Sequence, residues 1–381
     1  MRFETAAIHA GQDPEPTTGS AVVPIFQTST YAQDGVGVHK GYEYSRTDNP
    51  TRHALETCLA AIEGAGHARA FGSGMAAIST LAMTLRSGAR VLLATDVYGG
   101  TYRLFSKVLT DFGISFATVD MTDLDAVRNA AGDGVDLMLV ETPGNPMLKI
   151  LDLEGLAEIA HAAGGQLAVD NTFATMYLQR PLDFGADVVT YSGTKYLGGH
   201  SDLVAGSLAT NDDSLAERLR FLQNSIGAIP GPFDSWLLLR GLKTLGIRMR
   251  AHTAGAARIA AWLAERDDVV AVNYPGLEGF AGHDLARKQM SAQGEPLFGG
   301  MVSFEASSEE RALAICEGTE VFFLAESLGG VESLIEHPGR MTHASLAGSG
   351  IEVSPALVRL SVGIEHPDDL IADLERAMGG K

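Results

Sequence analysis

Short apolar runs alternate with helical patterns through the middle of the chain. The runs predict buried β-strands over residues 91–94, 114–119, 137–140, 167–169 and 188–191. The stretches between them, around residues 101–112, 123–131 and 154–163, carry apolar residues at helical spacing. We therefore predict an α/β fold in which helices cover both faces of an open, mostly parallel sheet.

The N-terminal segment lacks this alternation. Residues 1 to about 50 show no sustained helical period, and they contain Pro14, Pro16 and Pro24 together with many Ser and Thr residues. We predict an extended, irregular arm over residues 1–48. An arm of this length usually lies against another surface.

The alternation also weakens toward the C-terminus. A long helical pattern covers residues 233–263. Beyond it, strand patterns at 301–304 and 357–362 precede a helix that we expect at about 368–378. We therefore divide the chain after the arm into an α/β domain, residues 49–246, and a smaller C-terminal α+β domain, residues 247–381.

Size and charge exclude several classes of protein. With 381 residues the chain is long enough for a large core, so it is not a small disulfide-stapled fold. Its 28 Lys and Arg against 47 Asp and Glu give a formal net charge of −19, which repels phosphate backbones and anionic lipid. We therefore expect neither a nucleic-acid partner nor a membrane partner.

The scarcity of cysteines suits a reducing compartment, and the short apolar segments predict a protein that does not span a membrane. Cys58 and Cys316 match no metal-ligand spacing, so we expect both to be small buried hydrophobic side chains. The N-terminus has no basic start followed by an apolar core, and no apolar segment reaches the ~18–20 residues of a membrane span. We expect a soluble, cytoplasmic protein.

A glycine-rich turn precedes one of the helical patterns. The stretch GSGMAA at 72–77 fits G-x-G-x-x-A, and Asp96 follows about 20 residues later, as in dinucleotide-binding sites. The physics of such turns is less specific, because small residues let N–H groups at a helix N-terminus approach any phosphate. The strand that a dinucleotide fold needs at 67–71 is only weakly apolar, and a plain tight turn is a further interpretation.

Two other predicted strands end in polar side chains. Asp170 follows one strand, and Ser192, Thr194 and Lys195 follow the next. Taken singly, such an aspartate caps a helix and such a lysine is a surface charge. Together with the phosphate turn they are the groups that pyridoxal 5′-phosphate requires. A lysine binds the cofactor covalently, a carboxylate keeps the ring nitrogen protonated, and hydroxyls donate to the phosphate. Nicotinamide chemistry leaves the lysine unexplained.

These residues stand within longer stretches that are similar to one enzyme family. The stretches are YEYSRTDNPTR at 42–52, FGSGMAA at 71–77, DVYGGTYR at 96–103, VETPGNP at 140–146, VDNTF at 169–173, YSGTKYLGGHSD at 191–202, LAESLGGVESL at 324–334, MTHAS at 341–345 and VRLSVGIE at 358–365. Over nearly the whole chain the sequence resembles the Cys/Met-metabolism family of pyridoxal-phosphate enzymes, the trans-sulfuration enzymes. The resemblance implies fold type I, with a mostly parallel seven-stranded sheet, and pyridoxal 5′-phosphate as the cofactor.

The resemblance also implies roles for individual residues. Lys195 would bind the cofactor covalently and move the substrate proton, and Tyr98 would stack on the pyridine ring and assist that transfer. Arg359 would bind the substrate α-carboxylate with its guanidinium fork. The other cofactor-binding residues implied are Ser73, Gly74, Met75, Asn145, Asp170, Thr172, Ser192 and Thr194, and the other substrate-binding residues are Asn145, Ser327, Glu326 and Arg103.

Assembly is implied in the same way. Tyr44 and Arg46 match residues that reach the cofactor phosphate of a neighbouring subunit in this family. The resemblance therefore implies a homo-oligomer with shared sites, a tetramer built as a dimer of dimers. No metal is expected, because the eleven histidines show no metal-ligand spacing. We expect His200 and His343 to be structural hydrogen-bonding groups.

The family catalyses several reactions on sulfur amino acids, and local features bear on the choice. Gly100 stands where methionine γ-lyases typically carry cysteine. Arg103 and Glu326 match members that handle cystathionine, as partners for its distal carboxylate and ammonium. Glu43 and the MTHAS stretch resemble the γ-lyase, whereas YRLF at 102–105 and ESLGGVESLI at 326–335 equally resemble the γ-synthase.

We expect a cystathionine γ-lyase. Cystathionine γ-synthase is the second hypothesis and methionine γ-lyase is the third. The γ-synthase joins an O-substituted homoserine to cysteine. A regulatory protein of the same fold without catalytic activity is a fourth reading. It is disfavoured because Lys195, Asp170, Tyr98 and Arg359 are all present.

Overall fold

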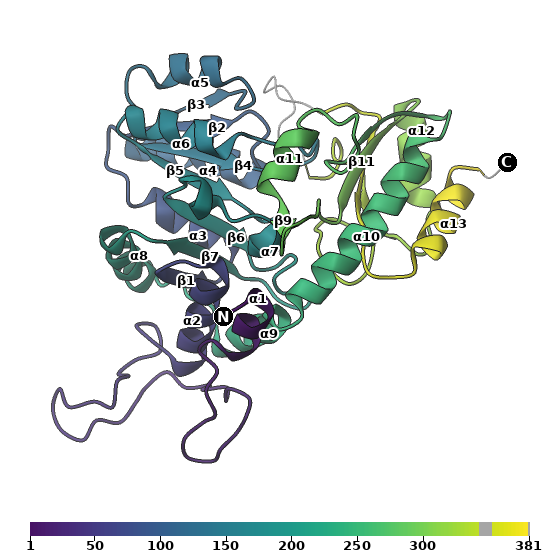
Figure 1. The fold of residues 1–381 in the computed structure, drawn as a ribbon. Coiled ribbons are helices and arrows are strands. Elements are labelled where there is room, and N and C mark those ends of the chain that lie inside the picture. The colour runs from purple at the N-terminus through teal and green to yellow at the C-terminus, as the bar shows by residue number, and fades with distance from the viewer. Residues whose placement is uncertain (343–352, 380–381) are drawn as a thin grey trace.

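Two large sheets, each with its own covering helices, and one two-stranded sheet form the described part of the computed structural model (Figure 1). The structure describes residues 1–342 and 353–379. A seven-stranded sheet is built from residues 67–210 and a five-stranded sheet from residues 269–361. The long helix α10 (Leu245–Ala264) runs from one sheet to the other.

The seven-stranded sheet confirms the predicted fold class. Its strand order is β1-β7-β6-β5-β4-β2-β3, and its strands are parallel except that β7 is antiparallel to both of its neighbours. The five strands that the apolar runs predict, β2 to β6, all form within one residue of the expected bounds. The strands are β1 (His67–Phe71), β2 (Arg90–Ala94), β3 (Ser115–Val119), β4 (Leu137–Glu141), β5 (Gln166–Asp170), β6 (Val188–Ser192) and β7 (Gly206–Thr210).

Burial on both faces explains why these strands are continuous apolar runs. Successive side chains of a strand point to opposite faces, so Leu92 and Leu93 of β2 lie in different hydrophobic clusters. The cluster of Leu93 includes residues of α3 (Gly74–Ala82), α4 (Gly99–Lys107) and α8 (Asp213–Ile226). The cluster of Leu92 includes residues of α5 (Leu124–Ala131) and α6 (Leu153–Ala162). Helices therefore cover both faces, as predicted.

Strands β1 and β7 have no comparable apolar pattern. The sequence of β1 is HARAF and that of β7 is GSLAT, yet all five residues of β7 are buried. The two strands pair with each other and pack against α3 and α8, so tertiary contacts rather than side-chain hydrophobicity fix them. The weakly apolar stretch before the glycine-rich turn is thus a strand after all.

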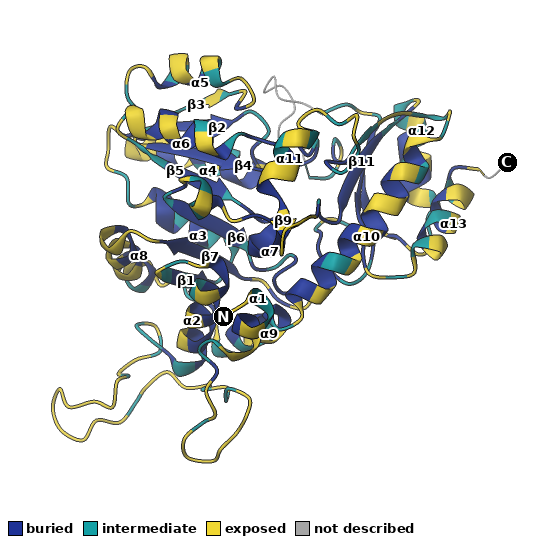
Figure 2. Cartoon of the chain, in the orientation of Figure 1, coloured by how far each residue is buried: buried dark blue, intermediate teal, exposed yellow. Residues whose placement is uncertain are grey.

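The arm is irregular over most of its length, but its first residues are helical. Helix α1 (Phe3–His9) contradicts the expectation of an extended segment from residue 1. Seven residues are too few to show a helical period, and the helix is held by burying Ala6 and Ala7 against α2 (Pro50–Glu63). The segment between α1 and α2 forms long, largely exposed loops that extend from the body (Figure 2).

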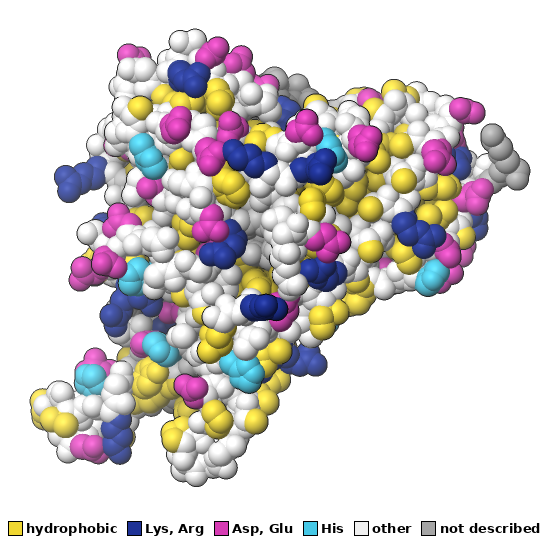
Figure 3. Space-filling model, viewed as in Figure 1, with side chains coloured by type: hydrophobic (Ala, Val, Ile, Leu, Met, Phe, Trp, Pro, Cys, Tyr) yellow, Lys and Arg dark blue, Asp and Glu magenta, His cyan; other side chains and the backbone are white. Residues whose placement is uncertain are grey.

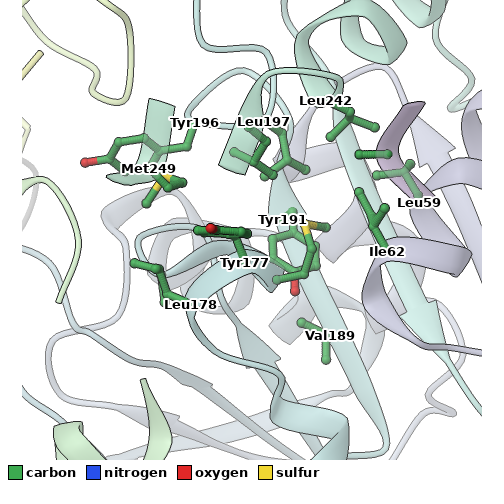
Figure 4. Close-up of a cluster of buried hydrophobic side chains, with 14 of the residues drawn as sticks. Leu59, Ile62, Tyr177, Leu178, Val189, Tyr191, Tyr196, Leu197, Leu242 and Met249 are labelled. Carbon is green, nitrogen blue, oxygen red and sulfur yellow. The ribbon is translucent and has the colours of Figure 1, made fainter. Parts of the chain in front are cut away.

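The helical pattern at 233–263 belongs to two helices rather than one. Helix α9 (Pro232–Leu242) ends before Lys243, and α10 begins at Leu245. The apolar period crosses the break because Leu242 of α9 and Leu245 of α10 enter the same cluster. Part of this cluster is drawn in Figure 4, where Leu242 and Leu59 lie near Tyr191 of β6.

The five-stranded sheet has the order β12-β13-β14-β11-β8, and α10, α12 (Glu309–Gly318) and α13 (Pro367–Ala377) contribute to its core. The strand patterns at 301–304 and 357–362 and the C-terminal helix are confirmed. The strands are β8 (Val269–Asn273), β11 (Met301–Ala306), β12 (Phe323–Leu324), β13 (Leu334–Glu336) and β14 (Leu357–Ser361). The smaller elements are η1 (Leu109–Phe112), α7 (Thr175–Leu178), η2 (Pro181–Phe184), α11 (His283–Gln289), β9 (Ser291–Ala292) and β10 (Glu295–Pro296).

Helix α10 belongs to both cores. Its first turns, with Leu245 and Met249, lie in the core of the large sheet, and its later turns, with Ile259 and Leu263, lie in the core of the small sheet. The predicted division between residues 246 and 247 falls in the first turn of this helix, and it stays a prediction. Both cysteines are buried and free, as expected. No helix in the described part of the chain is long and apolar enough to cross a bilayer.

Asp373 of α13 ties the C-terminal helix to the chain before β12. Its carboxylate accepts hydrogen bonds from the backbone N–H groups of Glu320, Val321 and Phe322, at 2.8–3.0 Å. We expect Asp373→Ala to lower the free energy of unfolding by about 1–3 kcal/mol, because three backbone donors lose their acceptor and one of them, the N–H of Phe322, is buried. Thermal unfolding measures this. Glu375→Ala, at an exposed position of the same helix, is the control, and an equal effect of the two substitutions would contradict the account.

Candidate active site

A cavity of about 250 Å³ lies at the carboxyl ends of β4, β5 and β6. The N-terminus of α3 borders it on one side, and residues 326–328 and Arg359 of β14 close it from the side of the small sheet. Ligands of open α/β sheets bind at this edge because strands end there and helices begin. Its described lining is Gly74, Met75, Ile78, Tyr98, Glu141, Asn145, Asp170, Thr172, Phe173, Ser192, Thr194, Lys195, Glu326, Ser327, Leu328, Thr342 and Arg359.

The first turn of α3 forms a cradle for an anion. Ser73 caps the helix, and its side chain accepts a hydrogen bond from the N–H of Ala76 at 3.0 Å. The N–H groups of Gly74 and Met75 belong to the turn whose donors a helix cannot satisfy itself. A side-chain carbon at residue 74 would lie 3.1 Å from Cβ of Ser192, so glycine is what lets the turn approach that residue. Hydroxyls of Ser192 and Thr194 border the cavity there.

Two carboxylates lie side by side on neighbouring strands of the cavity wall. Glu141 of β4 and Asp170 of β5 are partners in the parallel register. Burial raises the pKa of Glu141 well above its usual range, and the neighbouring Asp170 raises it further. Burial also raises the pKa of Asp170.

The hydrogen bonds of this pair decide where a shared proton resides. Asp170 accepts from the N–H of Thr172 at 3.0 Å and from its hydroxyl at 2.6 Å. Glu141 accepts a longer bond, 3.2 Å, from the N–H of Tyr98. Because the carboxylate with more donors is the better anion, we assign the proton to Glu141 and the charge to Asp170.

Lys195 reaches the cavity from the turn that follows β6. Its Nζ donates a hydrogen bond to Oγ of Ser327 at 2.5 Å. Burial, together with the nearby cation of Arg359, lowers the pKa of Lys195 to about 8. Ser327 holds a left-handed backbone conformation, with φ of 93°, which is uncommon for a residue with a side chain. A lysine with a lowered pKa is a nucleophile near neutral pH.

Arg359 lies across the cavity from the carboxyl ends of the large sheet and is only 2% exposed. Its Nη1 donates to Oδ1 of Asn145 at 2.8 Å, and its Nη2 donates to the carbonyl of Ser327 at 2.7 Å. Nη1 also lies 3.0 Å from Oε1 of Glu336. Among the described residues its Nε has no hydrogen-bond partner, although it is buried. An unused donor on a buried guanidinium suits a carboxylate ligand.

Tyr98 stands at the mouth of the cavity and is 41% exposed. It precedes α4, whose first residues Gly99 and Gly100 are buried. A side-chain carbon at residue 100 would lie 2.5 Å from Cε1 of Tyr98. The position of the tyrosine ring therefore depends on glycine at residue 100.

The structure brings most of the predicted site residues together, but four stand apart. Ser73, Arg103, Tyr44 and Arg46 are not part of the described cavity lining. Ser73 caps α3, and Arg103 is exposed on α4. Tyr44 is exposed on the arm, and Arg46 donates to the carbonyl of Asn224 at 2.7 Å.

Sequence reasoning missed two buried acidic residues. Glu141 and Glu336 stand within or beside the family-like stretches, yet neither was singled out. Their roles depend on register, because Glu141 pairs with Asp170 and Glu336 pairs with Arg359 across neighbouring strands. The signal that could have found them is an acidic residue at the very end of a buried apolar run.

The histidines take no part in this cavity within the described residues. His200 is exposed and hydrogen-bonds the carbonyl of Gly198 at 2.8 Å. His343 lies outside the described residues. In the described part of the chain, no group of three His, Cys, Asp or Glu side chains could hold a metal ion.

Comparison with known proteins finds similarity over nearly the whole chain. Residues 4–379 match the family described as Cys/Met metabolism PLP-dependent enzyme. Cystathionine γ-synthase of Mycobacterium tuberculosis is 53% identical over 378 residues, which cover 98% of this chain and 96% of that protein. Cystathionine β-lyase of Lactococcus lactis is 50% identical over 382 residues, covering 100% and 99%. The crystal structure of cystathionine γ-lyase from Lactobacillus plantarum complexed with L-serine superposes with a TM-score of 0.94 at 43% identity, covering 100% and 99%.

Proposed function

The chain belongs to the family of Cys/Met metabolism PLP-dependent enzymes, and we propose that it is a cystathionine γ-lyase. The reaction takes cystathionine and water to cysteine, 2-oxobutanoate and ammonia. One observation carries the proposal: a single cavity presents the amine of Lys195, the buried guanidinium of Arg359 and the carboxylate of Glu326. These groups suit an amino acid with an α-carboxylate at one end and an ammonium group at the other.

The cofactor is pyridoxal 5′-phosphate, and the residues present fit it. Gly74, Met75, Ser192 and Thr194 would hold the phosphate, and Asp170 would be the anionic partner of the ring nitrogen, since all five border one cavity. When bound, the cofactor supplies an electron sink that stabilises negative charge at the substrate Cα. The carboxylate of Asp170 keeps that sink effective because it favours the protonated nitrogen.

The chain's own residues supply binding and proton transfer. Arg359 binds the α-carboxylate with its unused Nε, and Asn145 holds the guanidinium in place through its hydrogen bond. Lys195 would be the base for the proton on Cα. The hydroxyl of Ser327 accepts a hydrogen bond from its Nζ at 2.5 Å and so orients the amine in the cavity. Tyr98 covers the mouth of the cavity.

Cystathionine γ-synthase is the second candidate, and the relatives favour it directly. Chains of that name are 52–53% identical to this one, and chains named cystathionine β-lyase are 49–50% identical. Cleavage at Cγ, replacement at Cγ and cleavage at Cβ all begin with binding of the same amino-acid group, so Lys195 and Arg359 serve each of them. Methionine γ-lyase is less favoured, since a cysteine at residue 100 would collide with Tyr98 in its present position.

The exposed arm supports a second part of the proposal, that subunits share their sites. Val22, Ile25, Val36 and Val38 are between 38% and 106% exposed, and Figure 3 shows apolar side chains on the loops of the arm. Apolar loops of this length gain stability by covering another surface. We propose that Tyr44 and Arg46 complete the phosphate site of a neighbouring subunit, in a homo-oligomer that we infer to be a dimer of dimers.

Lys195→Ala tests the cofactor attachment. The purified parent protein is expected to be yellow, and the variant is expected to lose the visible absorbance of lysine-bound cofactor. Turnover is expected to fall by several orders of magnitude, because both the attachment and the base are lost. Lys107→Ala, at an exposed position on α4, is the control and should behave like the parent. Near-normal turnover of Lys195→Ala would contradict the mechanism.

Product analysis tests the reaction. With cystathionine alone, 2-oxobutanoate and cysteine indicate cleavage at Cγ, and pyruvate and homocysteine indicate cleavage at Cβ. With O-succinylhomoserine and cysteine, accumulation of cystathionine indicates replacement. We expect the first result to dominate.

Glu326→Val should raise KM for cystathionine about two- to fivefold and leave KM for methionine nearly unchanged, since the exposed carboxylate makes a screened contact. An equal loss for both substrates would refute the role of Glu326.

Mixing Arg46→Ala with Lys195→Ala, at a cofactor concentration too low to saturate Arg46→Ala, tests the shared site. Arg46→Ala alone should weaken cofactor binding by roughly 1.5–3 kcal/mol, the contribution of a charge-assisted contact. Combined with Lys195→Ala under conditions of subunit exchange, it should recover part of the activity, because some hybrid sites contain both native residues. If exchange is verified by mass and no activity returns, each site lies within one subunit.

A further inference from the structure

Glu336 and Arg359 form a buried ion pair at the edge of the cavity. They are opposite each other in the antiparallel register of β13 and β14, and their side chains are 1% and 3% exposed. Oε1 of Glu336 lies 3.0 Å from Nη1 of Arg359 and also accepts a hydrogen bond from the hydroxyl of Thr342 at 2.8 Å. Oε2 of Glu336 has no partner among the described residues, although it is buried.

We propose that Glu336 takes up a proton from solvent when a substrate α-carboxylate binds to Arg359, so that this carboxyl couples substrate binding to pH. The inference rests on the proposed function, because it takes Arg359 as the binding site of the α-carboxylate. Glu336 is then a positioning residue that acts through Arg359. When Glu336 is ionised, its charge is paired with that of Arg359. When Glu336 is protonated, the charge of Arg359 is available to the substrate carboxylate.

Binding of a carboxylate changes the balance of charge around Arg359. While Glu336 is ionised, Arg359 is already paired, and the cavity offers a substrate carboxylate little net attraction at this point. Arrival of the substrate places two carboxylates on one guanidinium. Carboxylates that share a site cannot both stay ionised without cost, so one of them gains a proton. The substrate carboxylate gains the unused Nε, whereas Glu336 has an unpartnered oxygen, so the proton is better placed on Glu336.

The surroundings of Glu336 favour the same outcome. Burial raises the pKa of Glu336, and the cation of Arg359 only partly opposes this. The other charged groups that act on it are Glu326, which raises its pKa, and Lys195, which lowers it. From α12 the neutral thiol of Cys316 faces it, and Glu141 acts on Arg359 from β4. Besides Arg359, Lys195 is the one cation that acts on Glu336 among the described residues, and in the proposed holoenzyme its amine is bound to the cofactor.

Thermodynamic linkage turns the proposal into a measurable quantity. If carboxylate binding raises the proton affinity of Glu336 by some factor, protonation of Glu336 tightens carboxylate binding by the same factor. Binding is then tightest below the pKa of Glu336 and weakens as the pH rises through it. A carboxylate ligand without an amine isolates this effect, because it cannot displace Lys195 from the cofactor.

The experiment measures the dissociation constant of butanoate for the holoenzyme, from the visible absorbance of the bound cofactor, across the pH range in which the protein is stable. In the parent we expect the constant to rise with pH by about tenfold. In Glu336→Gln, which keeps the shape without the charge, the rise should be much smaller. At the alkaline end the variant should bind butanoate more tightly than the parent. Glu336→Asp retains a titrating carboxyl and should restore the pH dependence.

Controls separate this proposal from the proposed function. Butanamide, which has no charge, should show no difference between parent and Glu336→Gln. Glu375→Gln removes an exposed carboxylate of α13 that is not part of the described cavity lining, and it should keep the pH dependence of the parent. Cofactor content and thermal unfolding verify that each variant is folded.

Two results would overturn an assignment, and they differ. If Arg359→Lys binds butanoate as the parent does, Arg359 does not bind the carboxylate and the proposed function loses its site. If Arg359→Lys binds weakly but Glu336→Gln follows the parent at every pH, or binds more weakly throughout, the α-carboxylate site stands and the proton coupling is refuted.

Discussion

Burial of the central sheet on both faces is the constraint on which the rest of the structure depends. Strands covered by helices on either side have no room for unpaired polar groups along their length, so such groups gather where strands end. Asp170 ends β5, Lys195 follows β6, and the free N–H groups of α3 begin beside them. The small sheet closes the same edge with Arg359. The cavity is therefore a consequence of how the cores are built, and its position does not depend on the substrate.

Desolvation sets the chemistry within that cavity. It lowers the pKa of Lys195 to about 8 and raises the pKa of Glu141, Asp170 and Glu336. Each shift is tempered by specific hydrogen bonds, and these bonds decide which group carries charge. Asp170 accepts two hydrogen bonds from Thr172, which favour its anion, whereas Oε2 of Glu336 has no partner in the described chain. In the same low-polarity setting, the hydrogen bonds from Thr172 favour the anion of Asp170, and Arg359 and Thr342 oppose the burial that raises the pKa of Glu336.

The sequence predicted the parts of the fold that side-chain hydrophobicity determines. Strands β2 to β6 are apolar because two helix layers cover them, and the pattern shows this directly. Strand β7 could not be predicted because its sequence, GSLAT, is only weakly apolar and is buried by its neighbours. Helix α1 could not be predicted because seven residues are too few to show a helical repeat of apolar positions. Within the cavity, Lys195 and Asp170 could be predicted since both follow apolar runs. Glu141 and Glu336 could not, because their importance arises from which residue lies opposite them in a sheet.

Helix α10 determines how the two halves of the cavity can move. A helix of 20 residues is about 30 Å long and resists bending, and each of its ends is anchored in a different core. Helix α10 therefore holds the half that carries Lys195 at a nearly constant distance from the half that carries Arg359. Opening the cavity by moving one sheet away from the other would first require one end of α10 to leave the core in which it is buried. Glu326 and Tyr98 lie at the exposed rim of the cavity, outside both hydrophobic cores that anchor the helix.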